Sequence, residues 1–180
     1  MAKLVNNLLA VLLKAADHTT VCHADARRSS GKPRIYIADD ASPREKTAIV
    51  GAMKCPVILS REEYSDNAVM RTIDPRRVIP MTGGFNTEWL HSALRFLKAG
   101  GGVLIFSAGN MRYVDAGVLA LLSGAEILPL HSTSWYKLIR RHRITVGEPI
   151  SPGRIYDLSA DSVNTEIARV DSAMSSVREV

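Results

Sequence analysis

The sequence is poor in the residues that build disulfides, metal sites and membrane spans. Its two cysteines, Cys22 and Cys55, form neither a C-x-x-C pair nor a Cys/His metal spacing. We interpret both as reduced structural thiols and expect neither a bound metal nor a cofactor. No apolar run approaches the ~18 residues of a membrane-spanning helix, and Asn6 and Asn7 interrupt the apolar N-terminal segment that a signal peptide would keep continuous. These absences predict a cytoplasmic protein that lies, at most, peripherally at the inner membrane face.

Aromatic residues are also scarce, at 6%, and acidic residues are outnumbered, because 18 Asp and Glu stand against 23 Lys and Arg. The resulting net charge of +5 suits an acidic partner such as phospholipid headgroups, phosphorylated metabolites or nucleic acid. The cations are densest from Lys137 to Arg143, which we expect to be a solvated loop or hairpin end, or else a site for anionic lipid or a phosphate-bearing carrier. Without interleaved aromatics, this segment is a poor platform for nucleic acid. Its candidate anion-binding side chains are Arg140, Arg141 and Arg143.

What the sequence does contain is a regular alternation of short apolar runs and amphipathic stretches. The apolar runs predict strands, and the stretches with helical spacing predict helices. This alternation favours an α/β fold with a single, mostly parallel sheet, mixed at its edge, and helices on both faces. We expect one domain over 1–180, with an N-terminal helix and loop in 1–33, the α/β core in 34–150 and a C-terminal helix in 151–180. The expected strands are 34–38, 56–60, 77–81, 103–106, 126–130 and 144–147, and the expected helices are 4–16, 43–54, 61–72, 87–99, 118–122 and the apolar stripe from Val163 to Val177.

Two stretches carry clear local signals. Ser42 is a suitable N-cap, Pro43 suits the first helical position, and Glu45 stands three residues after the cap, so this stretch predicts a capping box. The polar residues from His18 to Lys32 are typical of a loop.

The stretch from Gly100 to Arg112 is the one around which the chain is arranged. Its three glycines precede a strand, whereas a phosphate-binding loop follows one, so we interpret them as a helix stop and tight turn. The strand 103–106 has no polar break, as in a parallel strand covered on both faces. It opens into the small, polar segment 107–110, where an α/β sheet usually binds its ligand.

The histidines fit no catalytic pattern. None is followed five residues later by Asp or Glu, and none stands beside a Ser or Cys in a nucleophile-elbow context. We interpret all five as ordinary surface or satisfied side chains; they are His18, His23, His91, His131 and His142.

With these segments in order, residues 35–150 resemble the glycerophospholipid acyltransferase family, which has the lysophosphatidic-acid-acyltransferase-like fold. In that family a strand ends in a Phe-Pro-Glu-Gly-Thr-Arg-Ser block, and the stretch from Leu104 to Arg112 occupies its place here. The stretch 124–130 is similar to the family's proline-bearing strand, and 144–150 is similar to its closing I-x-x-G-x-P-I strand. The resemblance implies substrate-binding roles for Ser107, Gly109, Asn110, Arg112 and Pro129.

The chain departs from the family at the positions that carry its chemistry. The family has a His-x4-Asp block in which His is the general base and Asp orients it, whereas Asp40 and Glu45 stand at these positions here. A carboxylate with a pKa of ~4 is a weaker base than an imidazole near ~6.5, and losing a positioned base costs on the order of 10²–10⁴ in rate. Ala108 and Met111 replace the family's phosphate-binding Glu and Arg, and the middle motif, 78–81, has no cation.

Resemblance and departures together leave three hypotheses. The first is an acyltransferase-like domain that is catalytically degenerate and binds acyl groups or a partner enzyme. The second is an active acyltransferase that moves an acyl group from acyl-CoA or acyl carrier protein to a lysophospholipid-like or other hydroxyl acceptor. Its base would be Asp40 with a raised pKa, or His23 if the alignment is displaced. The third is a regulatory or structural subunit that is not an enzyme. The partners are thus an acyl donor, an anionic phospholipid surface or a partner enzyme, and nucleic acid is disfavoured.

Overall fold

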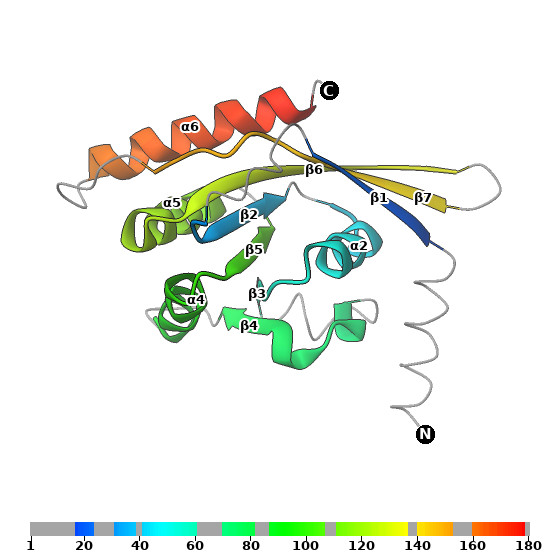
Figure 1. The fold of residues 1–180 in the computed structure, drawn as a ribbon, viewed down its shortest axis with the longest axis horizontal. Helices are drawn as coiled ribbons and strands as arrows, with labels where there is room; N and C mark the ends of the chain where they lie inside the picture. The colour runs from blue at the N-terminus through cyan, green and yellow to red at the C-terminus, as the bar shows by residue number, and fades with distance from the viewer. Residues whose placement is uncertain are drawn as a thin grey trace.

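One seven-stranded sheet organises the computed structural model (Figure 1), which describes residues 17–23, 31–38, 41–60, 70–81, 87–106, 111–136, 140–152 and 160–178. The strand order is β1-β7-β6-β2-β5-β3-β4. Neighbouring strands run parallel except β6 and β7, which are antiparallel, so the expected mostly parallel sheet with a mixed edge is confirmed. The strands are β1 (Asp17–His23), β2 (Arg34–Ala38), β3 (Val57–Ser60), β4 (Val78–Met81), β5 (Gly102–Phe106), β6 (Glu126–Tyr136) and β7 (Arg140–Val146).

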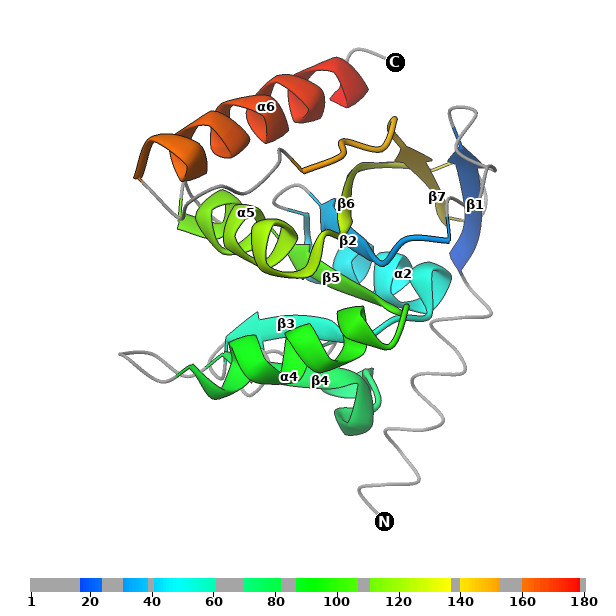
Figure 2. The same ribbon diagram turned by 60° about the vertical axis from the view of Figure 1, so that its left-hand side comes forward.

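Helices cover both faces of the sheet, as the sequence predicts. One core layer joins α4, α5 and α6 to the strand residues Ile35, Ile37 and Ile105. The other joins α2 and the 3₁₀ helix η1 to Leu104 and Phe106, the alternate residues of β5. Figure 2 shows α4, α5 and α6 gathered together, apart from α2. The bounds are α2 (Pro43–Met53), η1 (Met70–Thr72), η2 (Pro75–Arg77), α4 (Glu88–Lys98), α5 (Met111–Ser123) and α6 (Ala160–Arg178).

The central strands end level with one another at the carboxyl edge of the sheet. Ala38, the last residue of β2, pairs with Phe106 of β5 on one side and with Leu130 of β6 on the other. All three side chains are completely buried. Because neighbouring strands lie about 5 Å apart, the ends of β2 and β5 and the middle of β6 meet at one place on this edge.

The triple glycine does stop a helix, but its residues have separate roles. Gly100 has a φ of +78°, and its N–H donates to the Leu97 carbonyl at 2.9 Å, which ends α4. Gly102 belongs to β5 rather than to the turn. A Cβ at this position would lie 3.1 Å from the Tyr36 ring, so the glycine allows β5 to approach β2 closely.

Two polar stretches take part in the mixed edge of the sheet, and one of them was expected to be a loop. Part of the polar stretch from His18 to Lys32 forms β1, an edge strand parallel to β7. Its Thr19, Thr20 and Val21 are β-branched, and an edge strand can remain polar because one side of it faces solvent. For the basic segment the expected hairpin end is confirmed, because β7 begins at Arg140 and pairs antiparallel with the end of β6. Its alternation of buried and exposed side chains from 141 to 146 is that of a half-buried strand.

Three element boundaries also differ from the prediction. β6 continues past 130 to Tyr136, because antiparallel pairing with β7 supports the polar residues there. α5 begins at Met111, seven residues before the expected short helix 118–122. In the expected helix 61–72 the described residues, 70–72, form a 3₁₀ turn, and the expected helix 4–16 lies outside the described residues.

Candidate active-site edge

α2 begins at the carboxyl edge with the capping box that the sequence predicts. Both the backbone N–H and the hydroxyl of Ser42 donate to Glu45 Oε2, at 2.9 and 2.6 Å. In return the Glu45 N–H donates to Ser42 Oγ at 3.5 Å, and Pro43 stands at the start of the helix. The carboxylate that the sequence resemblance aligns with the family's orienting Asp is therefore bound to the cap of its own helix.

Two side chains from the mixed edge of the sheet join Glu45. Ser134 of β6 and His142 of β7 are direct cross-strand partners, so they share the sheet face that α2 covers. His142 is completely buried. Burial raises the pKa of Glu45, but hydrogen bonds from Ser42 and Ser134 and the charge of His142 outweigh burial and hold this pKa below its usual range. Glu45 is consequently ionised at neutral pH.

Lys46, the next residue of α2, brings a cation to the same edge. It is buried, and its Nζ lies 5.3 Å from the centroid of the Phe106 ring, within cation–π range. Phe106 is the last residue of β5, so the ammonium lies at the carboxyl edge of the sheet, on the α2 face. A mostly buried ammonium in this position can bind an anionic ligand group through charge-assisted hydrogen bonds.

Most of the expected substrate-binding residues lie outside the described ranges. Arg112 belongs to the first turn of α5, but its side chain is outside the described set. Ser107, Gly109 and Asn110 lie outside the described residues, and so does Asp40, the expected catalytic residue.

Pro129 lies inside β6, and its position is fixed by the sheet. It pairs with Ile37 of β2, and its carbonyl accepts the Gly147 N–H at 2.8 Å. Its neighbours Leu128 and Leu130 belong to the core layer on the α2 face. Because side chains alternate along a strand, the Pro129 ring belongs to the opposite face, away from Glu45 and Lys46.

The other candidates lie farther from this edge. Arg141 and Arg143 are exposed on β7, whereas the Arg140 side chain is outside the described set. His23 pairs with Val146 of β7, which pairs with Leu130 of β6. This places the His23 backbone three strands, or about 14 Å, from the end of β2.

The side chains gathered at this edge are here called the Glu45–Lys46 cluster, and they are Glu45, Lys46, Phe106, Ser134 and His142. Sequence reasoning missed three of them, Lys46, Ser134 and His142, although two of these had a signal. Lys46 shares helical spacing with Ile49, Val50 and Met53, so it belongs to the inward stripe of α2. His142 alternates with Ile144 and Val146, which marks it as inward-facing on β7. Ser134 had no comparable signal, because it lies in a polar run without apolar neighbours on its face of the strand.

Two general findings complete the description of the site. Among the side chains that the structure describes, no three His, Cys, Asp or Glu residues gather in a way that could hold a metal ion. None of the described helices is both long and apolar enough to cross a membrane.

Comparison with known proteins finds a likeness of fold and none of sequence. No family model and no curated protein matches the sequence. The crystal structure of the 1-acyl-sn-glycerophosphate (LPA) acyltransferase PlsC from Thermotoga maritima matches with a TM-score of 0.59 at 13% identity, covering 99% of this chain and 82% of that one. The fold is that of PlsC. A match at 13% identity shows similarity of fold alone, so the chemistry has to be argued from the residues of this chain.

Proposed function

We propose that this chain is a phospholipid-acyltransferase-type domain that has lost acyl transfer and binds a phosphate-bearing acyl lipid at the carboxyl edge of its sheet. The observation that carries the proposal is the set of hydrogen bonds that the Glu45 carboxylate accepts. Its Oε2 accepts two hydrogen bonds from Ser42, and its pKa is held below the usual range. The family's orienting carboxylate binds the imidazole of the base, whereas the Glu45 carboxylate is engaged by Ser42 and Ser134.

The neighbouring position supports the same conclusion. Glu45 would have to orient an imidazole five residues earlier, but that position is Asp40. Two carboxylates at these positions cannot form the imidazole–carboxylate pair that abstracts a proton from an acceptor hydroxyl. The family framework is thus present without its base.

Lys46 supports the binding part of the proposal. The family's phosphate-binding Arg is Met111 here, so that source of positive charge is absent. Lys46 brings a cation to the end of β5 from the neighbouring helix, and the Phe106 ring holds its ammonium from one side. We assign to Lys46 the phosphate of a lysophosphatidate-like lipid.

The test is acyl transfer to lysophosphatidate in detergent micelles, with acyl-CoA and with acyl carrier protein as donors. We expect the unaltered chain to show no turnover above background. Asp40→His restores a His-x4-acid spacing and should give measurable transfer, whereas the matched Asp39→His variant, displaced by one residue, should not. Robust turnover by the unaltered chain that disappears in Asp40→Ala would instead establish an active enzyme with Asp40 as its base.

Lipid binding is measured separately, by calorimetric titration with lysophosphatidate in the same micelles. Lys46→Met should weaken binding by about tenfold or more, because a charge-assisted hydrogen bond is lost. Lys54→Met changes an exposed lysine at the C-cap of the same helix and should leave binding unchanged. Equal affinity in the two variants would remove Lys46 from the phosphate site.

A further inference from the structure

The mixed edge of the sheet forms an extension with one covered face. It consists of β1, β7 and the part of β6 beyond Leu130. α2 is the described helix that packs against both β1 and β7, and it buries His142, Ile144 and Val146 completely. α6 packs on β6, and Figure 1 shows it over the other end of that strand, with no described helix above the far ends of β6, β7 and β1.

The uncovered face of this extension carries an ordered group of side chains, here called the Trp135–Arg143 face. Trp135 lies directly opposite Arg141, and Thr133 lies opposite Arg143, across the β6–β7 pair. Thr20 of β1 stands beside Arg143 on its other side. All five side chains are exposed, and Trp135 keeps 38% of its surface in solvent. The other described side chains on this face are Cys22, His131 and Thr145, so its described part contains no carboxylate.

The chemistry of this face matches the boundary between phospholipid headgroups and acyl chains. Successive outward side chains on a strand stand about 7 Å apart, so Arg141 and Arg143 can each bind a separate phosphate. An indole beside them combines an apolar ring with an N–H donor, and such side chains prefer the membrane interface. Arginine stems can lie along apolar surface while their guanidinium groups reach phosphates. The buried opposite face fixes the direction in which the whole group points.

We propose that the Trp135–Arg143 face docks this chain onto an anionic phospholipid bilayer. Charge complementarity selects an anionic partner, and an exposed tryptophan beside these arginines favours the interface of a bilayer over the polar surface of an acidic carrier protein. The choice of a lipid occupant rests on the proposed function. The existence of this exposed basic surface does not rest on the proposed function, because the surface lies on the face of the sheet opposite the Glu45–Lys46 cluster.

Co-sedimentation of the full chain with vesicles tests the proposal. Vesicles of equal parts phosphatidylglycerol and phosphatidylcholine should bind the chain, and pure phosphatidylcholine vesicles should bind it at least about tenfold more weakly. The double variant Arg141→Glu/Arg143→Glu should lose about tenfold or more in binding to the anionic vesicles, and Trp135→Ala should lose severalfold. Raising the salt from about 0.1 M to about 0.5 M should weaken binding by the unaltered chain.

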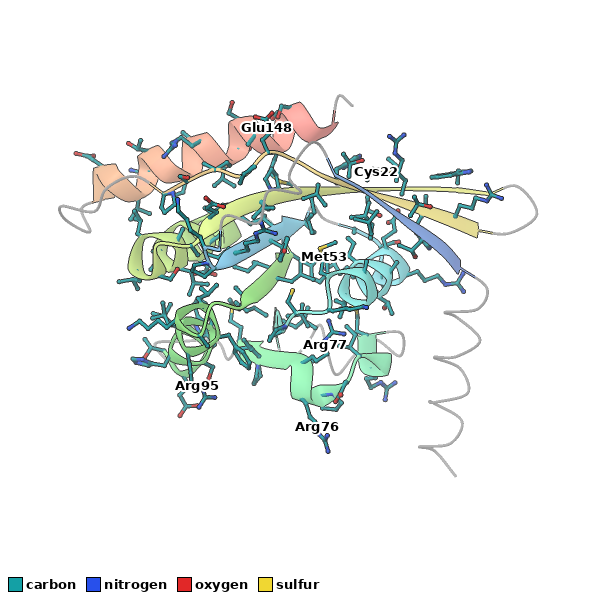
Figure 3. All side chains as sticks on the ribbon, in the orientation of Figure 1. Cys22, Met53, Arg76, Arg77, Arg95 and Glu148 are labelled. Atoms are coloured by element: carbon teal, nitrogen blue, oxygen red, sulfur yellow. The ribbon has the colours of Figure 1, made fainter. Side chains whose placement is uncertain are left out.

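The matched control is Arg76→Glu/Arg95→Glu, which changes the net charge by the same amount. Both arginines are exposed, and Figure 3 shows them on the side of the molecule away from β1 and β7. This control should bind anionic vesicles within about twofold of the unaltered chain. An equal loss in both double variants would show that binding follows net charge alone, and the proposal would fail.

Tryptophan fluorescence locates the contact. The chain has two tryptophans, so Trp89→Phe leaves Trp135 as the reporter. Phosphatidylglycerol vesicles with brominated acyl chains should quench this emission, whereas the same lipids should not quench Trp89 in a Trp135→Phe variant. Absent quenching of Trp135, or binding of acyl carrier protein through the same arginines without vesicle binding, would overturn the proposal. Because lysophosphatidate binding is measured in micelles with Lys46→Met, failure at the bilayer is distinguishable from failure of the proposed function.

Discussion

Arg77 joins two parts of the fold through one guanidinium group. Its Nη2 donates to the Val50 carbonyl in α2 at 2.7 Å and to the Cys55 carbonyl at 2.9 Å. Both acceptors belong to buried residues. Arg77 therefore holds the end of α2 and the segment before β3 against η2. Without it the Cys55 carbonyl would lose this donor, and the Val50 carbonyl would keep the Lys54 N–H at 3.3 Å.

Arg77→Met should lower the free energy of unfolding by about 2 kcal/mol, because buried carbonyls lose charged donors. Arg76→Met is the matched control: Arg76 is exposed and points away from the body of the molecule (Figure 3), so it should change stability by less than about 0.5 kcal/mol. Urea unfolding followed by circular dichroism measures both. Identical midpoints for the two variants would contradict a structural role for the Arg77 hydrogen bonds.

At this scale the sequence predicts a residue when the signal is local. Ser42 and Glu45 follow a spacing that serves one helix end, so the capping box could be predicted and is confirmed. His142 and Lys46 depend on which face of an element meets its neighbour. As residue types, histidine and lysine would be predicted to be exposed to solvent. Only the apolar residues that share their periodicity indicate that these two side chains are buried.

α2 is the element that couples the candidate site to the rest of the sheet. The hydrogen bonds from Ser42 and Ser134 and the charge of the nearby His142 all favour the ionised form of Glu45 and so lower its pKa. A carboxyl whose pKa is lowered in the folded state stabilises the fold above its unfolded pKa, and this stabilisation is lost as the pH falls through the folded value. The helix start is therefore an acid-sensitive part of the fold.

Glu45→Gln should lower the free energy of unfolding at neutral pH, by less than about 1 kcal/mol because the group is partly screened by solvent. The difference from the unaltered chain should be constant above about pH 4.5, the ordinary pKa, and should vanish on acidification below it. Urea midpoints measured across this pH range provide the check. Glu148→Gln, at an exposed position after β7, is the control and should show no such pH dependence. A Glu45→Gln effect that persists at low pH would rule out the charge as its source.

At the level of elements, the sequence predicts central strands better than edge strands. β2 and β5 are apolar on both faces and bounded by turn residues, so their positions were predicted to within one residue. β1 and the outer halves of β6 and β7 contain Thr, Ser, His and Arg. Pairing with the distant β7 makes β1 a strand, whereas β6 and β7 form a hairpin whose polar residues lack the apolar pattern of a strand. Long-range pairing leaves little trace in a local window of sequence.

The two cysteines report on the integrity of the whole molecule. Cys55 is buried in the core layer on the α2 face, and burial raises the pKa of its thiol to about 11. Cys22, on β1, is partly exposed. Reaction of Cys55 with a thiol reagent therefore requires the core to open, whereas reaction of Cys22 does not.

A thiol reagent at neutral pH should modify one of the two cysteines quickly and the other at least about a thousandfold more slowly. Mass spectrometry of peptides should identify the fast site as Cys22, and Cys22→Ser should abolish the fast phase. Both thiols should react quickly in denaturant. Rapid modification of Cys55 in the native protein would show that this core layer opens without global unfolding.

For the whole molecule, the α/β class and the mostly parallel sheet could be predicted because alternating segments have few alternative arrangements. The candidate site could be predicted only as a place, the carboxyl edge. Its residues come from α2, β5, β6 and β7. The order in which the strands pair cannot be predicted from the sequence of any one of these elements.

The pairing of β1 with β7 has a consequence for the timing of folding during synthesis. Asp17 pairs with Arg140, so β1 leaves the ribosome more than a hundred residues before its partner strand exists. At about 5–20 residues per second, the interval is on the order of ten seconds. The pairs that β2, β3 and β5 form with one another involve residues made well before β7, so the centre of the sheet can assemble while β1 is still without its neighbour. In the nascent chain, β1 is thus made first among these strands but is among the last to pair with its neighbour in the sheet.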